Sequence, residues 1–375
     1  MDHSGPIARR FPLIARFRPA CLPLPARVAH LAALADTSER HNDEGVASSV
    51  YNQAALLASD LGLPGLAQAM CHEHAAAYLR ACPLPAMNAI RGLEPLVNLA
   101  RLHIRAGHPD AGRERLLALY EAVTAGTAAT VDGIVVPADL TKTAEDRHEV
   151  RAWLWRVLLA DGTRTLTTEG RWPEALAHIE QHRGVGTRML DGRQVAVLAA
   201  LTNDDTDRAL DLLANTVPGE PWEQAVSACL TVLCRRDANL PHRAELDTLL
   251  DTYRDRDAAP GLTVFETRLG LSVLDAMGTT DVPAAHRVAD DLYRQAMELR
   301  DGYAAREVLA HQPCSTLVTA RQAQDLTNLI QSCALGAGTM SAALQADLST
   351  ALDTSRRVLA RKLLGLTRYC NNADL

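Results

Sequence analysis

Aromatic residues are scarce in this chain of 375 residues, since Phe, Trp and Tyr together make up only 4% of it. Sheets favour aromatic and β-branched side chains, whereas alanine, which is abundant here, is the strongest helix former. The hydrophobic fraction of 47% is that of an ordinary globular protein and argues against a chain that is disordered throughout. The composition therefore predicts an all-α protein.

Lysine is almost absent, because Lys142 and Lys362 are the only two among 38 basic residues. Such a preference for arginine is typical of a GC-rich, actinobacterial genome and needs no functional cause. Acidic residues outnumber basic ones, 45 against 38, and the net charge is −7. This mildly acidic balance argues against a nucleic-acid-binding protein.

Long apolar runs are also missing, and none reaches the roughly 18 residues that a membrane helix requires. We therefore expect no membrane association. Residues 1–24 contain four arginines, among them Arg10 and Arg16, but no long apolar core, so they do not form a secretory signal. We interpret them as a basic N-terminal arm, either a loosely ordered terminus, which we favour, or a docking arm.

The eight cysteines form no CxxC pair and no metal-ligand spacing. They stand mostly among apolar residues, which indicates free thiols in a reducing, cytoplasmic environment. The run Cys71-His72-Glu73-His74 offers at most two ligands to any one face of a helix, which is too few for a metal. Because glycine-rich phosphate loops, GxSxG and HExxH motifs are absent as well, we expect neither a cofactor nor a metal.

Apolar residues recur at intervals of three and four along most of the chain, and Pro and Gly fall between these stretches. Helix, short turn and helix follow one another repeatedly, with turns such as Ala106-Gly107-His108-Pro109 and Glu169-Gly170-Arg171-Trp172-Pro173. A small residue follows each turn, where we expect the second helix to cross the first so closely that only a small side chain fits. These residues are Ala67, Ala111, Ala175, Ala209, Ala244 and Ala285. The interval from Ala175 to Ala209 is nearly the same as the interval from Ala209 to Ala244.

This pattern resembles the tetratricopeptide repeat family, whose helix-turn-helix unit has a period of about 34 residues. The resemblance covers residues 45–300 in pattern, although most of the family's Trp, Tyr and Pro signature positions are missing. It implies an α-α superhelix (solenoid) of helical hairpins with a concave groove. A different solenoid or a compact helix bundle are the alternatives.

We therefore expect a basic arm (1–24), tetratricopeptide-like repeats (25–300) with an inserted loop or small hairpin at about 126–143, and a C-terminal helical cap (301–375). Within the cap, the apolar pattern of residues 340–366 predicts one long helix. We expect this helix to cover the last repeat, because the end of an array otherwise exposes its core.

Polar side chains interrupt the apolar pattern on the first helices of several repeats. In a tetratricopeptide-like superhelix these helices line the groove, where side-chain amides can hold a peptide backbone and arginine can hold a carboxylate. The partner-binding residues that we predict on this basis are Asn98, Arg101, Arg105, His148, Arg151, Trp155, Gln194 and Gln224. The alternative interpretation is an ordinary solvated face of these helices.

We predict a non-catalytic scaffold or regulator that binds a protein or peptide segment in this groove. The alternative is an enzyme or biosynthetic accessory protein that uses Arg101, Arg151, His148 and a carboxylate such as Glu94 or Asp161 in the same groove. A third hypothesis is that copies of the chain associate through the long C-terminal helix.

Overall fold

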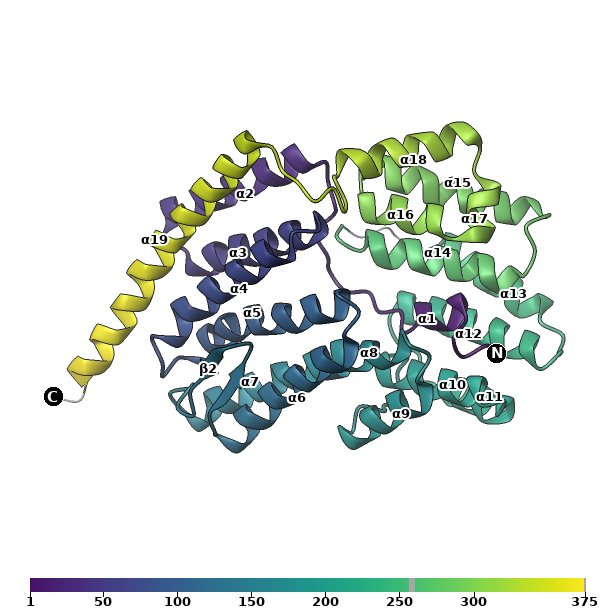
Figure 1. Ribbon diagram of the computed structural model, residues 1–375. Helices are drawn as coiled ribbons and strands as arrows, with labels where there is room; N and C mark the ends of the chain where they lie inside the picture. Colours follow the sequence, from purple (N-terminus) through teal and green to yellow (C-terminus); the bar gives the residue numbers. More distant parts are fainter. Residues whose placement is uncertain (256–259, 374–375) are drawn as a thin grey trace. The chain divides into compact units, whose positions relative to one another are not determined.

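The computed structural model describes residues 1–255 and 260–373, and side chains up to residue 364. In this part of the chain the regular structure is helical apart from one two-stranded sheet, so the predicted all-α class is confirmed (Figure 1). No helix in it is long and apolar enough to cross a membrane.

The chain forms two compact units. Unit 1 contains residues 1–23 and 166–333, and unit 2 contains residues 24–165 and 334–375. The chain therefore passes from unit 1 into unit 2, returns to unit 1, and ends in unit 2.

Unit 2 begins with five helices in succession. These are α2 (Leu24–His41), α3 (Glu44–Asp60), α4 (Pro64–Leu79), α5 (Ala86–Arg105) and α6 (Pro109–Ala125). After a hairpin follow α7 (Ala144–Val157) and the π-helical turn η1 (Leu158–Gly162), and unit 2 ends with α19 (Ala342–Ala373). The short helix α8 (Thr163–Thr167) begins in unit 2 and ends in unit 1. Proline occupies the first turn of α4 and α6, where its missing N–H costs nothing.

Unit 1 contains the short α1 and a longer run of helices. These are α1 (Pro6–Arg10), α9 (Trp172–Gln181), α10 (Asp191–Thr202), α11 (Thr206–Ala214), α12 (Pro221–Asp237) and α13 (Arg243–Arg254). They are followed by α14 (Thr263–Met277), α15 (Pro283–Glu298), α16 (Gly302–Ala310), α17 (Gln312–Leu317) and α18 (Ala320–Ser332).

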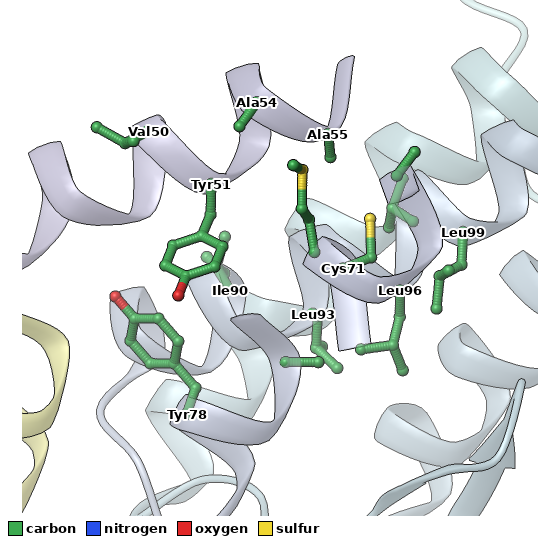
Figure 2. Packing of buried hydrophobic residues seen from close by; sticks show 14 of the residues in the cluster. Val50, Tyr51, Ala54, Ala55, Cys71, Tyr78, Ile90, Leu93, Leu96 and Leu99 are labelled. Atoms are coloured by element: carbon green, nitrogen blue, oxygen red, sulfur yellow. The ribbon is translucent and has the colours of Figure 1, made fainter. Parts of the chain in front are cut away.

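Helices that follow one another in the chain pack together, and their apolar stripes meet between them. In unit 2 the buried side chains of α3, α4 and α5 form one continuous core (Figure 2). Tyr51 and Tyr78 both contact the ring of His74 in this core, with ring centroids at 5.1 and 5.7 Å from the histidine ring. The same apolar period that predicted the helices thus determines which of their faces are buried.

The small residues after the turns mark close helix contacts at four of the six predicted positions. Ala67, Ala175, Ala209 and Ala285 are completely buried near the start of α4, α9, α11 and α15. At the two remaining positions the prediction was wrong in detail. Ala244 is exposed, and on α6 the close contact is made by Gly112, where a Cβ would lie 2.5 Å from the Ile104 side chain.

The segment expected to hold a loop or small hairpin contains a hairpin. Strands β1 (Ala129–Val131) and β2 (Ile134–Val136) pair antiparallel, with Val131 opposite Ile134. Asp132 and Gly133 form the two-residue turn, and both have positive φ, as this turn type requires. Asp132 also accepts a hydrogen bond of 2.7 Å from Arg115 on α6, which holds the hairpin against the helices.

The long C-terminal helix packs against the two helices with which unit 2 begins rather than against the helices that precede it in the chain, so its expected place is corrected. α19 lies along α2 and α3, and Leu348, Leu352 and Leu359 on its apolar face are buried (Figure 1). The last helices before it, α16 and α18, pack against each other within unit 1. The apolar face of α19, the helix that we considered for association between copies, is therefore buried within one chain.

Residues 1–23 belong to unit 1 and are packed, whereas the sequence favoured a loosely ordered terminus. Ala8, Phe11 and Cys21 are completely buried, and Leu13 nearly so. Their burial depends on helices that lie far along the chain, which a local sequence pattern does not include.

Candidate functional site

Two asparagines, one from α3 and one from α5, form the centre of a polar network in unit 2. Asn98 donates a hydrogen bond of 3.1 Å to the side-chain oxygen of Asn52 and accepts one of 3.0 Å from Arg101. Asn52 in turn donates to Glu94 at 2.7 Å. We call Asn52, Glu94, Asn98, Arg101 and Asp161 the polar ladder, because its members come from three different structural elements.

Asp161 completes the ladder from the π-helical turn η1. Its Oδ2 accepts hydrogen bonds from Nε and Nη2 of Arg101, at 3.1 and 2.7 Å. The Arg101 side chain is nevertheless 48% exposed and that of Asp161 23% exposed. Turns of π-helix are rare and occur frequently at functional sites.

Glu94 is the half-buried glutamate of the ladder. Burial raises the pKa of its carboxyl above the ordinary value, and the hydrogen bond from Asn52 and the charges of Arg91 and Arg101 only partly oppose this. A group with a shifted pKa at the edge of a polar network is a feature of binding and catalytic sites, and also of structural networks.

Arg105 makes further polar contacts at the end of α5, beyond the polar ladder. Its guanidinium donates to Ser59 Oγ at 2.6 Å and lies 3.4 Å from Asp60 Oδ1. Asp60 is shared, since Arg27 also donates to it at 2.8 Å. Nearer the start of α5, Arg91 pairs with Glu44 of α3 at 3.0 Å. Polar contacts between α3 and α5 therefore follow most of the length of the two helices.

Three predicted residues lie on α7, which contacts α5. His148 and Arg151 are exposed and lie one turn apart, with Nη2 of Arg151 at 3.4 Å from Nδ1 of His148. Trp155 is half-buried on the next turn. These three residues lie in the same unit as the ladder. The contact between His148 and Arg151 joins these two residues to each other.

Gln194 and Gln224 are in unit 1, so the eight predicted residues do not form one set. Gln194 is completely buried and holds the backbone of Leu13, so its assignment to an open partner-binding surface is corrected. Gln224 is exposed and donates to the carbonyl of Gly219 at 3.1 Å, just before its own helix.

Asn52, Ser59 and Asp60 of α3 were not predicted from the sequence. A signal was present, because Asn52 and Ser59 lie two helical turns apart and share one face of a largely apolar helix. The apolar period of the same helix obscured it.

The Cys71–His74 run is structural, as we interpreted it. His74 is buried, and its Nε2 lies 2.9 Å from the Ser48 hydroxyl, whereas Glu73 accepts a hydrogen bond from Tyr51. Among the described residues no group of three or more His, Cys, Asp and Glu side chains is arranged to hold a metal ion.

Burial lowers the pKa of His74 to about 3, so the ring is neutral in the folded protein at neutral pH. An unfolded chain takes up a proton at this histidine near pH 6.5, and the folded chain does not. We therefore expect this residue's contribution to the free energy of unfolding to decrease by about 1 kcal/mol per pH unit as the pH falls from the unfolded pKa towards the folded one.

Urea unfolding of the parent and of His74→Gln between pH 4 and 7 measures this contribution. The difference between their free energies of unfolding should depend on pH, because the parent should lose more of its free energy of unfolding at low pH than the variant does. A constant difference would show that His74 takes up its proton without opening the core.

Asn52, Asn98 and Arg101 thus place amide and guanidinium groups on neighbouring helices, with the half-buried carboxyl of Glu94 beside them. Comparison of the chain with protein-family models, curated proteins and solved structures gave no match, so the interpretation of this site rests on its own geometry.

Proposed function

We propose that the chain is a non-catalytic scaffold of tetratricopeptide-like helical hairpins that binds an extended protein or peptide segment through unit 2. Helices α3 to α7 each contact the next along the chain, and α5 also contacts both α3 and α7. Stacked helical hairpins make contacts of this kind. They favour a solenoid arrangement in which α3, α5 and α7 are the first helices of successive hairpins.

The observation that carries the proposal is the polar ladder, which joins α3 and α5 and continues to η1, the turn that follows α7. Each asparagine amide uses one N–H and one lone pair of its oxygen within the ladder. The side-chain amide group has a second N–H and a second lone pair, which are what a peptide backbone in extended conformation requires. Arg101 offers two parallel donors, which suit a carboxylate of the bound segment.

The existing ion pair between Arg101 and Asp161 supports this assignment. Partly exposed ion pairs contribute at most about 1 kcal/mol, so exchanging one carboxylate for another at Arg101 costs little. Asp161 would then hold the guanidinium in position until a peptide carboxylate replaces it.

We expect Arg101→Ala to weaken peptide binding at least tenfold, because a charge-assisted hydrogen bond contributes about 1.5–3 kcal/mol. Phage-displayed random dodecapeptides selected on the full chain provide the probes, and fluorescence anisotropy measures their affinities. Arg151→Ala should weaken binding as well, while the circular dichroism of both variants stays that of the parent.

Arg80→Ala is the matched control, because Arg80 is an exposed arginine at the end of α4, a second helix of its hairpin. It should bind the selected peptides as the parent does. Peptides that bind Arg101→Ala and Arg151→Ala with parental affinity would place the binding surface elsewhere. A selection that enriches no peptide would contradict the proposed function.

A further inference from the structure

The N-terminal segment (residues 1–23) crosses several helices of unit 1 in a mostly extended conformation. Only α1 is regular, and residues 11–23 contain no helix or strand (Figure 1). The segment contacts α9 through His3, whose carbonyl accepts a hydrogen bond of 2.9 Å from the Trp172 ring nitrogen. It continues to α14, α10 and α16, which alternate with other helices along the chain.

One side-chain amide holds the backbone of the segment at Leu13. Gln194 of α10 accepts a hydrogen bond of 2.7 Å from the Leu13 N–H and donates one of 2.8 Å to the Leu13 carbonyl. Such a two-point contact on one residue recognises extended backbone without reading its side chain. The Leu13 side chain itself is buried, at 2% exposure.

Three arginines of the segment meet groups of complementary chemistry on three different helices. Arg10 forms an ion pair with Asp275 of α14, and both side chains are buried. Arg16 donates from one nitrogen to both oxygens of Asp191 of α10, each at 2.8 Å. The Arg18 guanidinium lies 4.0 Å from the centre of the Tyr303 ring of α16, a cation–π contact.

These contacts are those of a bound peptide rather than of a strand or helix in a core. A side-chain amide holds the backbone, an apolar anchor is buried beside it, and the charges of Arg10 and Arg16 are matched by aspartates. Residues 16–18 are less enclosed than the segment on either side of them, since the Phe17 side chain is 75% exposed and Arg16 50%, whereas Leu13 and Cys21 are buried. Release can therefore begin at residues 16–18 without opening the contacts of Leu13.

We propose that the face formed by α10, α14 and α16 is a second peptide-binding surface, specific for an extended segment that carries arginines and an apolar anchor. The N-terminal segment is its occupant within the chain, and a partner protein's segment of the same chemistry displaces it. This inference concerns unit 1 and does not depend on the function proposed for unit 2.

Tethering sets the conditions under which displacement is seen. A covalently linked segment has an effective concentration of about 1 mM, so it excludes a free peptide of micromolar concentration. Weakening the linked segment lets a free peptide with the original sequence compete. The full chain therefore allows the test without truncation.

The probe is a fluorescent synthetic peptide of residues 3–22, added to the full chain and followed by anisotropy. We expect it to bind the variant Arg16→Ala/Arg18→Ala at least tenfold more tightly than it binds the parent. The variant Arg9→Ala should bind as weakly as the parent, because Arg9 is an exposed arginine of the same segment. A probe peptide with Arg10→Glu should bind neither variant.

A folded double variant that does not bind the probe more tightly than the parent would overturn the proposal. Hydrogen exchange of the parent gives a second, mutation-free measurement at the Leu13 amide, whose hydrogen bond to Gln194 is buried. We expect this amide to exchange faster than the core amides of α10 and α14. Exchange only together with those helices would show that the segment is an integral part of the core, and the proposal would fail.

Discussion

Replacing Asp275 with asparagine should lower the free energy of unfolding of unit 1 by about 3–5 kcal/mol, because it leaves the buried Arg10 guanidinium without a counter-charge. Asp275 lies between two partners, Arg10 and His311, whose Nε2 is 3.0 Å from Asp275 Oδ1. His311 is oriented for this contact, since its Nδ1 accepts the N–H of Cys314 at 3.1 Å. The asparagine amide can accept from His311 but places N–H groups against those of Arg10.

Hydrogen exchange with mass spectrometry during urea unfolding locates this loss, because it reports on the peptides of each unit separately. Asp291→Asn is the control, since Asp291 pairs with Arg294 on the exposed face of α15. It should change the stability by no more than about 0.5 kcal/mol. An effect of Asp275→Asn as small as that of the control would mean that the contacts of Asp275 with Arg10 and His311 do not hold residues 1–23 in place.

The same aspartate makes the stability of unit 1 depend on pH. Burial alone would raise the pKa of Asp275, but the hydrogen bond from His311 and the charge of Arg10 outweigh burial, and the pKa is lowered. A carboxyl of this kind contributes stability that is present above its unfolded pKa of about 3.9 and lost as pH falls through its folded pKa. Asp275→Asn should lack this part of the acid sensitivity.

Replacing Leu359 with aspartate should lower the free energy of unfolding of unit 2 by about 4 kcal/mol, because the change removes a core side chain and buries a charge. Leu359 is 1% exposed on α19, which packs against α2 and α3. Urea unfolding followed by circular dichroism measures the loss, and exposure of α2 and α3 should appear as faster hydrogen exchange in their peptides.

Leu364 provides a matched control on the same helix. It is 62% exposed, and Leu364→Asp should leave both the unfolding curve and the hydrogen exchange unchanged within about 0.5 kcal/mol. Equal stability of the two variants would mean that α19 is not needed to cover α2 and α3. Loss of stability in both would mean that the surface around Leu364 is buried by a further contact.

Local pattern predicted the elements of this protein well, because a helix is formed by contacts within a few residues of each other. The three- and four-residue period located the helices, and the buried alanines Ala67, Ala175 and Ala209 marked close helix contacts. The register failed at Ala244, since that residue follows a turn but faces solvent. Spacing alone does not distinguish a buried alanine after a turn from an exposed one.

The candidate site was predicted only in part. Asn98, Arg101 and Arg105 of α5 do face polar partners, since they follow one side of one helix. Their partners Asn52 and Asp161 come from other elements, and the choice of partner depends on how the helices are stacked. For the same reason Gln194 has the side-chain chemistry that we predicted for gripping a peptide backbone, but the backbone that it holds is the chain's own.

The sequence by itself determined the all-α class and the helices, since their signals, side-chain period and turn residues, are short-range. It left a loop or a small hairpin open at about 126–143, and the structure shows a hairpin there. Only the tertiary structure decided that α19 covers α2 and α3 and that residues 1–23 lie against α10, α14 and α16. Both are docking events between segments that are far apart in the sequence. Their specificity comes from shape and from paired charges in three dimensions, which no local pattern contains.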